Sequence, residues 1–258
     1  MGKSRKLVYK KILIEQLTAH LKNQMWDLFS KNYDSVSRNQ FDIDLSDKTA
    51  VFVFFDSGDH TFQGFSTYKI YLHDYKNQKI GVIFSGDTMI HPDYWGQGAM
   101  HGALGKEAIL WKLKHPTTPL YWYMICMGYR TYLSMARCLP THFWPRYSQE
   151  TPDWEKGLIA SLSSERFKEA WKENEGLIRY DQCLGTLKKE VAPITEKELK
   201  LEDIKYFVKV NPGYTEGDEL ACIARISFIW FLGFIPVIFM KKLKKLSVKK
   251  PVQKIKTT

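Results

Sequence analysis

The sequence has few cysteines, and no apolar run opens it. Its four cysteines, Cys126, Cys138, Cys183 and Cys222, lie 12, 45 and 39 residues apart and form no Cys-x-x-Cys pair. This spacing predicts neither a structural zinc site nor a disulfide framework, and we expect no metal. Because the first residues are charged rather than apolar, no signal peptide is expected and a cytoplasmic location is favoured.

Acidic residues are absent from both ends of the chain. Residues 241–258 contain eight lysines and residues 1–12 contain five basic side chains, without one acid in either segment. The net charge of the whole chain is +10, so residues 13–240 carry a net charge of −3. This charge gives no basis for a groove that binds nucleic acid. The basic ends instead favour an acidic partner, such as an acyl carrier protein or an anionic membrane surface.

The chain does contain enough apolar material for a folded protein, with 258 residues of which 44% are hydrophobic and 14% aromatic. Apolar residues recur every three or four positions from Leu13 to Phe29, which predicts an amphipathic helix. Short runs of β-branched and aromatic residues then predict three strands, at Ala50–Phe55, Phe65–Leu72 and Ile80–Ile90. Within the third strand, Gly81 and Gly86 indicate bulges or a close approach of the backbone.

A glycine-bearing loop, His91–Met100, separates these strands from a predicted helix at Ala103–Leu113. The apolar run Leu120–Met127 predicts a strand that is buried on both faces. A short helix is predicted at Tyr129–Cys138. We therefore expect residues 13–145 to form one α/β (or α+β) unit, with a mixed, mostly antiparallel sheet flanked by helices.

Three further segments complete the expected organisation. Residues 1–12 are expected to form a basic arm, and residues 146–222 a helical and mixed extension with a helix from Ser163 to about Arg179 and a strand at Ile204–Val210. Residues 223–258 contain the apolar segment Ile226–Met240 and the lysine-rich tail. As a helix this segment would span about 22 Å, less than the ~30 Å hydrocarbon core. A buried core helix and membrane association through this segment both remain open.

The loop before the second predicted helix has the features of an anion site. Gly96 and Gly98 leave the backbone uncovered, and the first N–H groups of a helix have no partner within the helix. Together with the helix dipole, these groups suit a pyrophosphate. No Gly-Lys-Ser/Thr follows, which excludes a P-loop, and the three-glycine fingerprint of dinucleotide folds is missing. An ordinary turn from strand to helix is the alternative.

The run Ile90–Ala99, with Trp95-Gly96-Gln97-Gly98 at its centre, resembles the pyrophosphate loop of the GCN5-related N-acetyltransferases (GNATs). It is most similar to the branch that acetylates ribosomal proteins. The order of predicted elements over residues 13–145 is also similar. The resemblance implies transfer of an acyl group from acyl-CoA or acetyl-CoA to an amine, by direct attack and without a covalent enzyme intermediate.

The resemblance also implies a set of donor-binding residues. In this family two neighbouring parallel strands separate, and the pantetheine arm pairs with the first of them, here near Met89 and Ile90. The pyrophosphate would lie on the loop and the start of its helix, which comprise Trp95, Gly96, Gln97, Gly98, Ala99 and Met100. Two positions depart from the family pattern, because Trp95 stands where Arg or Gln is usual and Met100 where a small residue is expected.

Acyl transfer to an amine needs a base for the amine and a stabilised or protonated thiolate. Tyr129 and Tyr132, just after the predicted buried strand, are candidates for the acid, although both also suit packing. Asp87 and His91, near the end of the preceding strand, are candidates for the base. A non-catalytic relative that binds an acyl thioester or a membrane is the alternative function, and a nucleic-acid binder ranks last.

Overall fold

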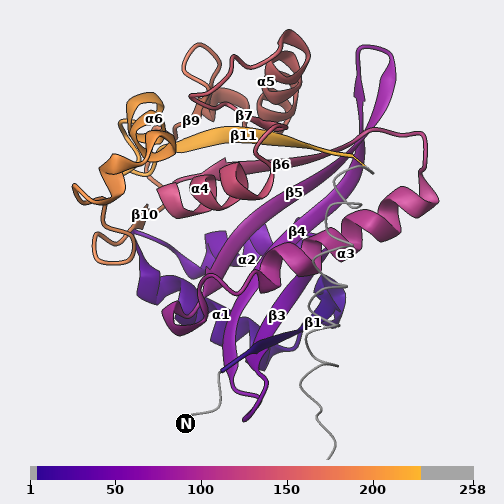
Figure 1. Ribbon diagram of the computed structural model, residues 1–258. Coiled ribbons are helices and arrows are strands. Elements are labelled where there is room, and N and C mark those ends of the chain that lie inside the picture. Colours follow the sequence, from indigo (N-terminus) through magenta and orange to yellow (C-terminus); the bar gives the residue numbers. More distant parts are fainter. Residues whose placement is uncertain (1–4, 228–258) are drawn as a thin grey trace, which may run out of the picture. The chain divides into compact units, whose positions relative to one another are not determined.

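The computed structural model describes residues 5–227, and its centre is a mixed sheet of nine strands with helices on both faces (Figure 1). The sheet order is β1-β3-β4-β5-β6-β11-β9-β8, and β7 pairs with β11 outside this path. A separate small sheet joins β10 to β2. The strands are β1 (Leu7–Leu13), β2 (Tyr33–Asp34), β3 (Ala50–Asp56), β4 (Phe62–Tyr75), β5 (Gln78–Ile90), β6 (Leu120–Cys126), β7 (Phe143–Trp144), β8 (Trp171–Lys172), β9 (Leu177–Ile178), β10 (Thr186–Leu187) and β11 (Glu219–Ile226).

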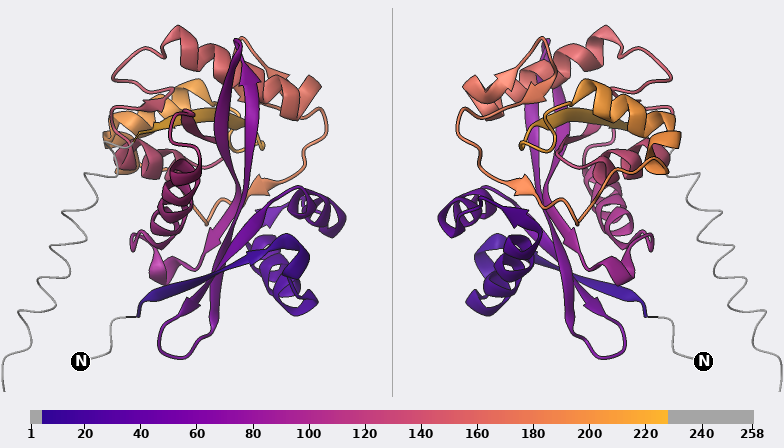
Figure 2. Two further views of the ribbon diagram at one scale, coloured as in Figure 1. Left: turned by 90° about the vertical axis from the view of Figure 1, so that its right-hand side faces the viewer. Right: turned by 90° about the vertical axis from the view of Figure 1, so that its left-hand side faces the viewer.

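The helices lie in two layers, one on each side of the sheet (Figure 2). The α-helices are α1 (Ala19–Asn32), α2 (Arg38–Ser46), α3 (Ala99–Lys114), α4 (Tyr129–Cys138), α5 (Asp153–Phe167) and α6 (Glu202–Val210). Short 3₁₀ turns are η1 (Ile14–Gln16), η2 (Pro92–Tyr94), η3 (Lys168–Ala170) and η4 (Glu198–Lys200). Helices α1, α2 and α5 cover one face, on which Arg166 of α5 reaches Asp47 at the end of α2 at 2.5 Å. Helix α3 covers the other face.

The core forms where the alternating side chains of the strands meet these helices. Val51, Val53 and Phe65 pack against Met25 of α1 and Phe41 of α2. Further along the same face, a second cluster joins the sheet to α5 and includes Phe84, Tyr121, Tyr123, Leu158 and Leu162. The predicted mixed α/β fold class is therefore confirmed, because both faces of a mostly antiparallel sheet are covered by helices.

Most of the predicted elements up to residue 138 are present, with shifted ends. The helix predicted from Leu13 begins at Ala19, because the Thr18 side chain accepts a hydrogen bond from the Leu21 N–H and caps it there. Helix α2 was not predicted. Its apolar face is small, with Phe41 and Leu45 as its buried residues, and its start is marked by the Ser37 cap.

Two predictions in the C-terminal part are wrong. Ile204–Val210 lies in helix α6, where the buried Ile204 and Phe207 are three residues apart, as one helix face requires. The helix expected from Ser163 to Arg179 instead ends at Phe167, because Ser163 lies near the end of α5 rather than at a helix start. A short apolar run can be read as either a strand or a helix, which explains the first error.

The expected segment boundaries differ from the structure. Leu7–Leu13 is not part of a separate arm, because it pairs with β3 along its whole length. Residues up to Arg225 form one compact unit, so residues 146–222 are continuous with the rest of the fold. The boundary at 222/223 falls inside β11, which lies between β6 and β9.

Most of the apolar segment Ile226–Met240 and all of the lysine tail 241–258 lie outside the described residues. Membrane association through this segment therefore stays a prediction. Within residues 5–227, no helix is long and apolar enough to cross a membrane.

Strands β5 and β6 pair in parallel over only part of their length. Gly81–Ser85 pairs with Leu120–Met124, and beyond Ser85 the registered pairing of β5 is with β4 alone. At the same point two residues of β5, Gly86 and Asp87, oppose the single residue Thr67 of β4, which is a β-bulge. The strands thus separate at the bulge, and a gap opens between their carboxyl ends.

The close approach predicted at Gly81 is confirmed by its contact with α3. A Cβ added at this glycine would lie 2.2 Å from Cη2 of Trp111. We expect Gly81→Ala to lower the free energy of unfolding by about 1–3 kcal/mol, because the indole must move in a packed layer. Urea denaturation would measure this change. The control is Gly102→Ala on α3, where an added Cβ meets nothing within 4 Å, and equal losses in both variants would contradict the prediction.

Candidate functional site

The predicted pyrophosphate loop connects β5 to α3 at the mouth of this gap. Gly96 and Gly98 have φ angles of +77° and +71°, a left-handed conformation that favours glycine. No described side chain caps α3, whose N-cap is Gly98. A Cβ at either glycine would meet nothing within 4 Å. The first-turn N–H groups of α3 have no hydrogen-bond acceptor within residues 5–227, and the residues present fit an anionic group.

Trp95 holds the loop to the end of β5 and also contacts α4. Its indole Nε1 donates a hydrogen bond of 2.7 Å to the Ile90 carbonyl. The guanidinium of Arg130, the second residue of α4, lies 4.4 Å from the centre of the Trp95 ring. One backbone acceptor that the resemblance assigned to pantetheine, the Ile90 carbonyl, is therefore occupied by the loop itself, and Met89 is paired with Phe65 of β4.

The other loop side chains fix the loop against β1 and β3. The Gln97 amide accepts a hydrogen bond from the Leu7 N–H at 3.1 Å and donates one to the Arg5 carbonyl at 3.0 Å. The buried Tyr94 donates its hydroxyl to Asp56 at 2.6 Å. The position of the loop is thus determined by residues that precede it by 38 to 92 positions in the chain.

A chain of polar contacts links α3 and α4 to the sheet where β5 and β6 separate. Trp122 of β6 donates its indole N–H to Ser85 of β5 at 2.9 Å. His101 lies against Trp122, and its Nε2 is 3.1 Å from the Ser134 hydroxyl of α4. Burial lowers the pKa of His101. Ala99 and Met100, which precede this histidine, are half-buried in the first turn of α3.

Asp87 lies in the bulge, half-buried, on the side of the sheet that α2 covers. Burial raises the pKa of Asp87 to about 6, with opposing effects from Lys48 and Asp44. Lys48, whose side chain is 5% exposed, donates to the Asp44 carbonyl at 2.6 Å. Across the gap, at the start of β11, Glu219 has its pKa raised to about 8 by burial and by the Asp87 charge. The bulge therefore holds a carboxyl group that titrates close to neutral pH.

The two candidate acids differ in their surroundings. The Tyr132 hydroxyl donates to the Pro145 carbonyl at 3.0 Å, and its ring packs against Phe143 and Phe207. Tyr129 is the first residue of α4, next to Arg130, and makes no hydrogen bond within residues 5–227 through its hydroxyl. Burial raises the pKa of both tyrosines. Of these two tyrosines, Tyr129 is the one whose hydroxyl forms no hydrogen bond within residues 5–227.

His91, the second candidate base, lies exposed just after β5. Its ring Nδ1 accepts a hydrogen bond of 3.4 Å from the backbone N–H of Asp93, and the backbone N–H of His91 donates to the Gln63 carbonyl at 2.8 Å. It borders a hollow of about 240 Å³ between α1 and the start of β4. The structure therefore separates His91 from Asp87, which faces α2.

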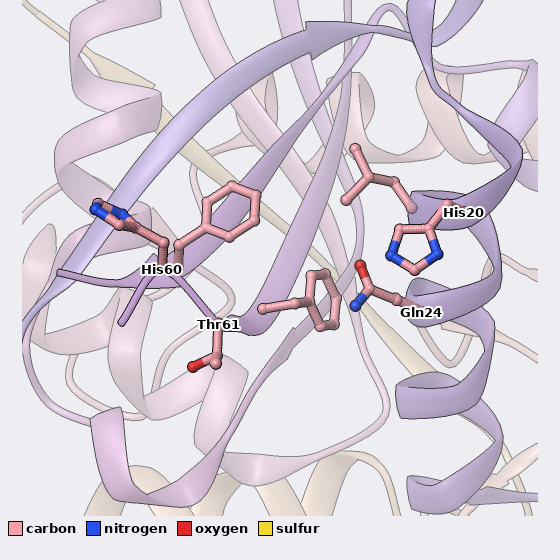
Figure 3. Close-up of a pocket in the computed structure, with 7 residues that line it drawn as sticks. His20, Gln24, His60 and Thr61 are labelled. Carbon is pink, nitrogen blue, oxygen red and sulfur yellow. The ribbon is translucent and has the colours of Figure 1, made fainter. Parts of the chain in front are cut away.

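A neighbouring hollow of about 430 Å³ lies beside α1 and is lined by His20, Gln24, His60 and Thr61, among others (Figure 3). Neither hollow includes the loop glycines, Asp87 or Tyr129. Within the described residues, no group of three or more His, Cys, Asp or Glu side chains is placed to hold a metal ion.

No motif or spacing in the sequence predicts a role for Arg130, His101 or Glu219. Arg130 directly follows the candidate Tyr129 in the sequence, and this adjacency was the one signal that could have pointed to it. His101 lies on α3 and Glu219 on β11. Their positions depend on how α3 packs and on the order of the strands in the sheet.

No family model matches the sequence, and no curated protein has a significant match to it. Solved structures are similar in fold. A probable N-acyltransferase from Enterococcus faecalis shares 18% identity over 51% of this chain and 32% of its own, with a TM-score of 0.36. A GNAT-family N-acetyltransferase from Escherichia coli, solved with CoA, shares 11% sequence identity over 52% of this chain and 69% of its own chain, with a TM-score of 0.35.

An acetyltransferase from Bacillus cereus shares 10% identity over 86% of this chain and 100% of its own, with a TM-score of 0.37. The chain thus spans about a third of the Enterococcus protein and the whole of the Bacillus one. At these identities, and with TM-scores below 0.5, the matches assign neither an activity nor site residues to this chain.

Proposed function

We propose that the protein is an acyltransferase that moves an acyl group from acyl-CoA to an amine. One observation carries the proposal: two parallel strands separate beside a helix whose N-terminus is opened by two glycines and is not capped. This arrangement offers an anion site and a gap in the sheet next to each other. The acyl donor supplies a thioester when bound.

The loop and β5 perform the binding in this proposal. The first-turn N–H groups of α3, from Ala99 onwards, receive the diphosphate, assisted by the helix dipole. The end of β5, near Met89 and Ile90, holds the pantetheine arm. Gln97 positions the loop by holding it to β1.

Asp87 is our candidate for the base. Its pKa of about 6 leaves the carboxyl group ionised at neutral pH but still basic enough to accept a proton from an amine. It makes no hydrogen bond within residues 5–227, so its oxygens are not engaged elsewhere. His91 is the weaker candidate, because its Nδ1 is in contact with the Asp93 N–H and it lies in the exposed loop.

We propose Tyr129 as the acid that protonates the departing thiolate, and the two tyrosines can be separated by mutation. Tyr129→Phe is expected to lower kcat by about a hundredfold or more, as for other positioned acids. Tyr132→Phe is expected to keep kcat but to lower the free energy of unfolding by about 1 kcal/mol, because the Pro145 carbonyl loses its donor. Steady-state kinetics and urea denaturation measure the two effects. A loss of kcat in Tyr132→Phe alone would reverse the assignment.

The proposal is tested by incubating the protein with acetyl-CoA or longer acyl-CoA esters and a pool of amines, and measuring the release of free thiol. Thiol release that depends on the amine supports the transferase. Binding without release supports the second candidate, a non-catalytic acyl-thioester binder, which is favoured by the contact of Trp95 with Ile90. The absence of any binding would refute both. An acyl carrier protein as donor and an anionic membrane as partner remain proposals for the basic ends.

A further inference from the structure

Arg130 reaches the pyrophosphate loop from the opposite side of the gap. The loop follows β5, whereas α4, which carries Arg130, follows β6. The guanidinium lies 4.4 Å from the centre of the Trp95 ring and 5.5 Å from that of Tyr129. The contact with Trp95 therefore joins the two walls of the opening and places a positive charge at the loop that leads into α3.

This positive charge has no counter-ion in the described part of the chain. Arg146, Arg166 and Arg179 each form an ion pair with a carboxylate, at 2.5–3.1 Å. Arg130 is exposed and makes neither an ion pair nor a hydrogen bond within residues 5–227. Arg5, the other arginine at the loop, is already 3.4 Å from Asp93. Arg130 is thus the cation at this loop whose hydrogen-bond donors remain free.

We propose that Arg130 binds the phosphates of the acyl donor and that Trp95 serves as the platform that orients its guanidinium. This inference rests on the proposed function and adds a binding residue to it. A guanidinium held over an aromatic ring keeps its five N–H donors at the edge of its plane, where they can bind a phosphate in bidentate fashion. Trp95 itself is uncharged, so Arg130 provides the charge that the loop lacks.

The test compares the binding of coenzyme A with that of pantetheine, which has no phosphate. Arg130→Ala is expected to raise the Kd of coenzyme A by about tenfold or more, measured by calorimetry, and to leave the Kd of pantetheine unchanged. Arg130→Lys keeps the charge but loses the planar guanidinium and its bidentate donors, and should recover part of the affinity. Dephospho-coenzyme A, without the 3′-phosphate, shows which phosphate Arg130 contacts.

Arg137→Ala is the matched control, because Arg137 lies on the same helix two turns away and is also exposed. Its Kd for coenzyme A should equal that of the wild type. An unchanged Kd in Arg130→Ala, or an equal loss for coenzyme A and pantetheine, would overturn the inference while leaving the acyltransferase intact. Tighter binding in Arg130→Ala would also overturn it and would show that the Arg130–Trp95 contact obstructs the site. Wild-type protein that binds no coenzyme A refutes the function itself.

Discussion

Gly98→Glu is expected to abolish both the binding of acyl-CoA and the release of thiol. This is the largest effect that we expect from a single substitution in this protein. The carboxylate of the new side chain can accept hydrogen bonds from the first-turn N–H groups of α3, as an N-terminal acid does. It would then occupy the place of the diphosphate and repel it. We expect a Kd for coenzyme A at least about a hundredfold higher than that of the wild type, which corresponds to about 3 kcal/mol.

Backbone strain alone must be excluded as the cause of this loss. Gly98 has a φ of +71°, and a glutamate there is strained by about 1–2 kcal/mol. Gly176 has a φ of +72°, and an added Cβ there also meets nothing within 4 Å, but it lies in the turn between β8 and β9. Gly176→Glu therefore carries the same strain and should bind coenzyme A normally. If the two variants lose binding equally, the loop is not the phosphate site.

Asp87→Asn is expected to reduce kcat by about a hundredfold or more and, at the same time, to stabilise the fold above pH 6. The catalytic loss follows from removing the base. In the wild type, kcat/KM should rise with pH through about 6 and then level off, because the pKa of Asp87 is about 6. A pH profile of both proteins measures this, and a wild-type profile that is flat from pH 5 to 8 would exclude Asp87 as the base.

Asp87→Asn is expected to raise the stability of the fold although it lowers kcat. The pKa of Asp87 is raised from 3.8 to about 6 on folding, so the folded state binds its proton more tightly. The resulting stabilisation is complete below pH 3.8 and is lost as the pH rises through 6. Asn cannot ionise, so the variant should melt at a higher temperature than the wild type at pH 8 and at a similar one near pH 4. Asp74→Asn, an exposed β4 carboxylate paired with Lys79, should change neither property.

The elements that the sequence predicts well are those whose pattern is local and repetitive. The buried run that became β6 and the run Ile80–Ile90 that became β5 were both identified, and Gly81 and Gly86 marked a close approach and a bulge. Helix α6 was misread because nine residues are too few to distinguish a helical from an extended period. Helix α2 was missed because most of its residues are polar.

The candidate site was predictable only where it is continuous in the chain. The loop from Trp95 to Met100 is one segment, so its glycines and the following helix predict an anion site directly. Arg130 and Glu219 reach the gap from α4 and β11, and their positions depend on strand order, which no local pattern encodes. The indole of Trp95 bonding to Ile90 depends on the conformation of the whole loop and was not predictable from spacing.

Strand β11 has a consequence for how this protein can be shortened. It covers the side of β6 that faces away from β5, and it is the last strand of the chain among the described residues. A version that stops before Glu219 would leave β6, a run of almost entirely buried apolar residues, with unpaired N–H and C=O groups along one margin. Such an uncovered apolar margin recruits strands from other molecules, so we expect the truncated protein to aggregate.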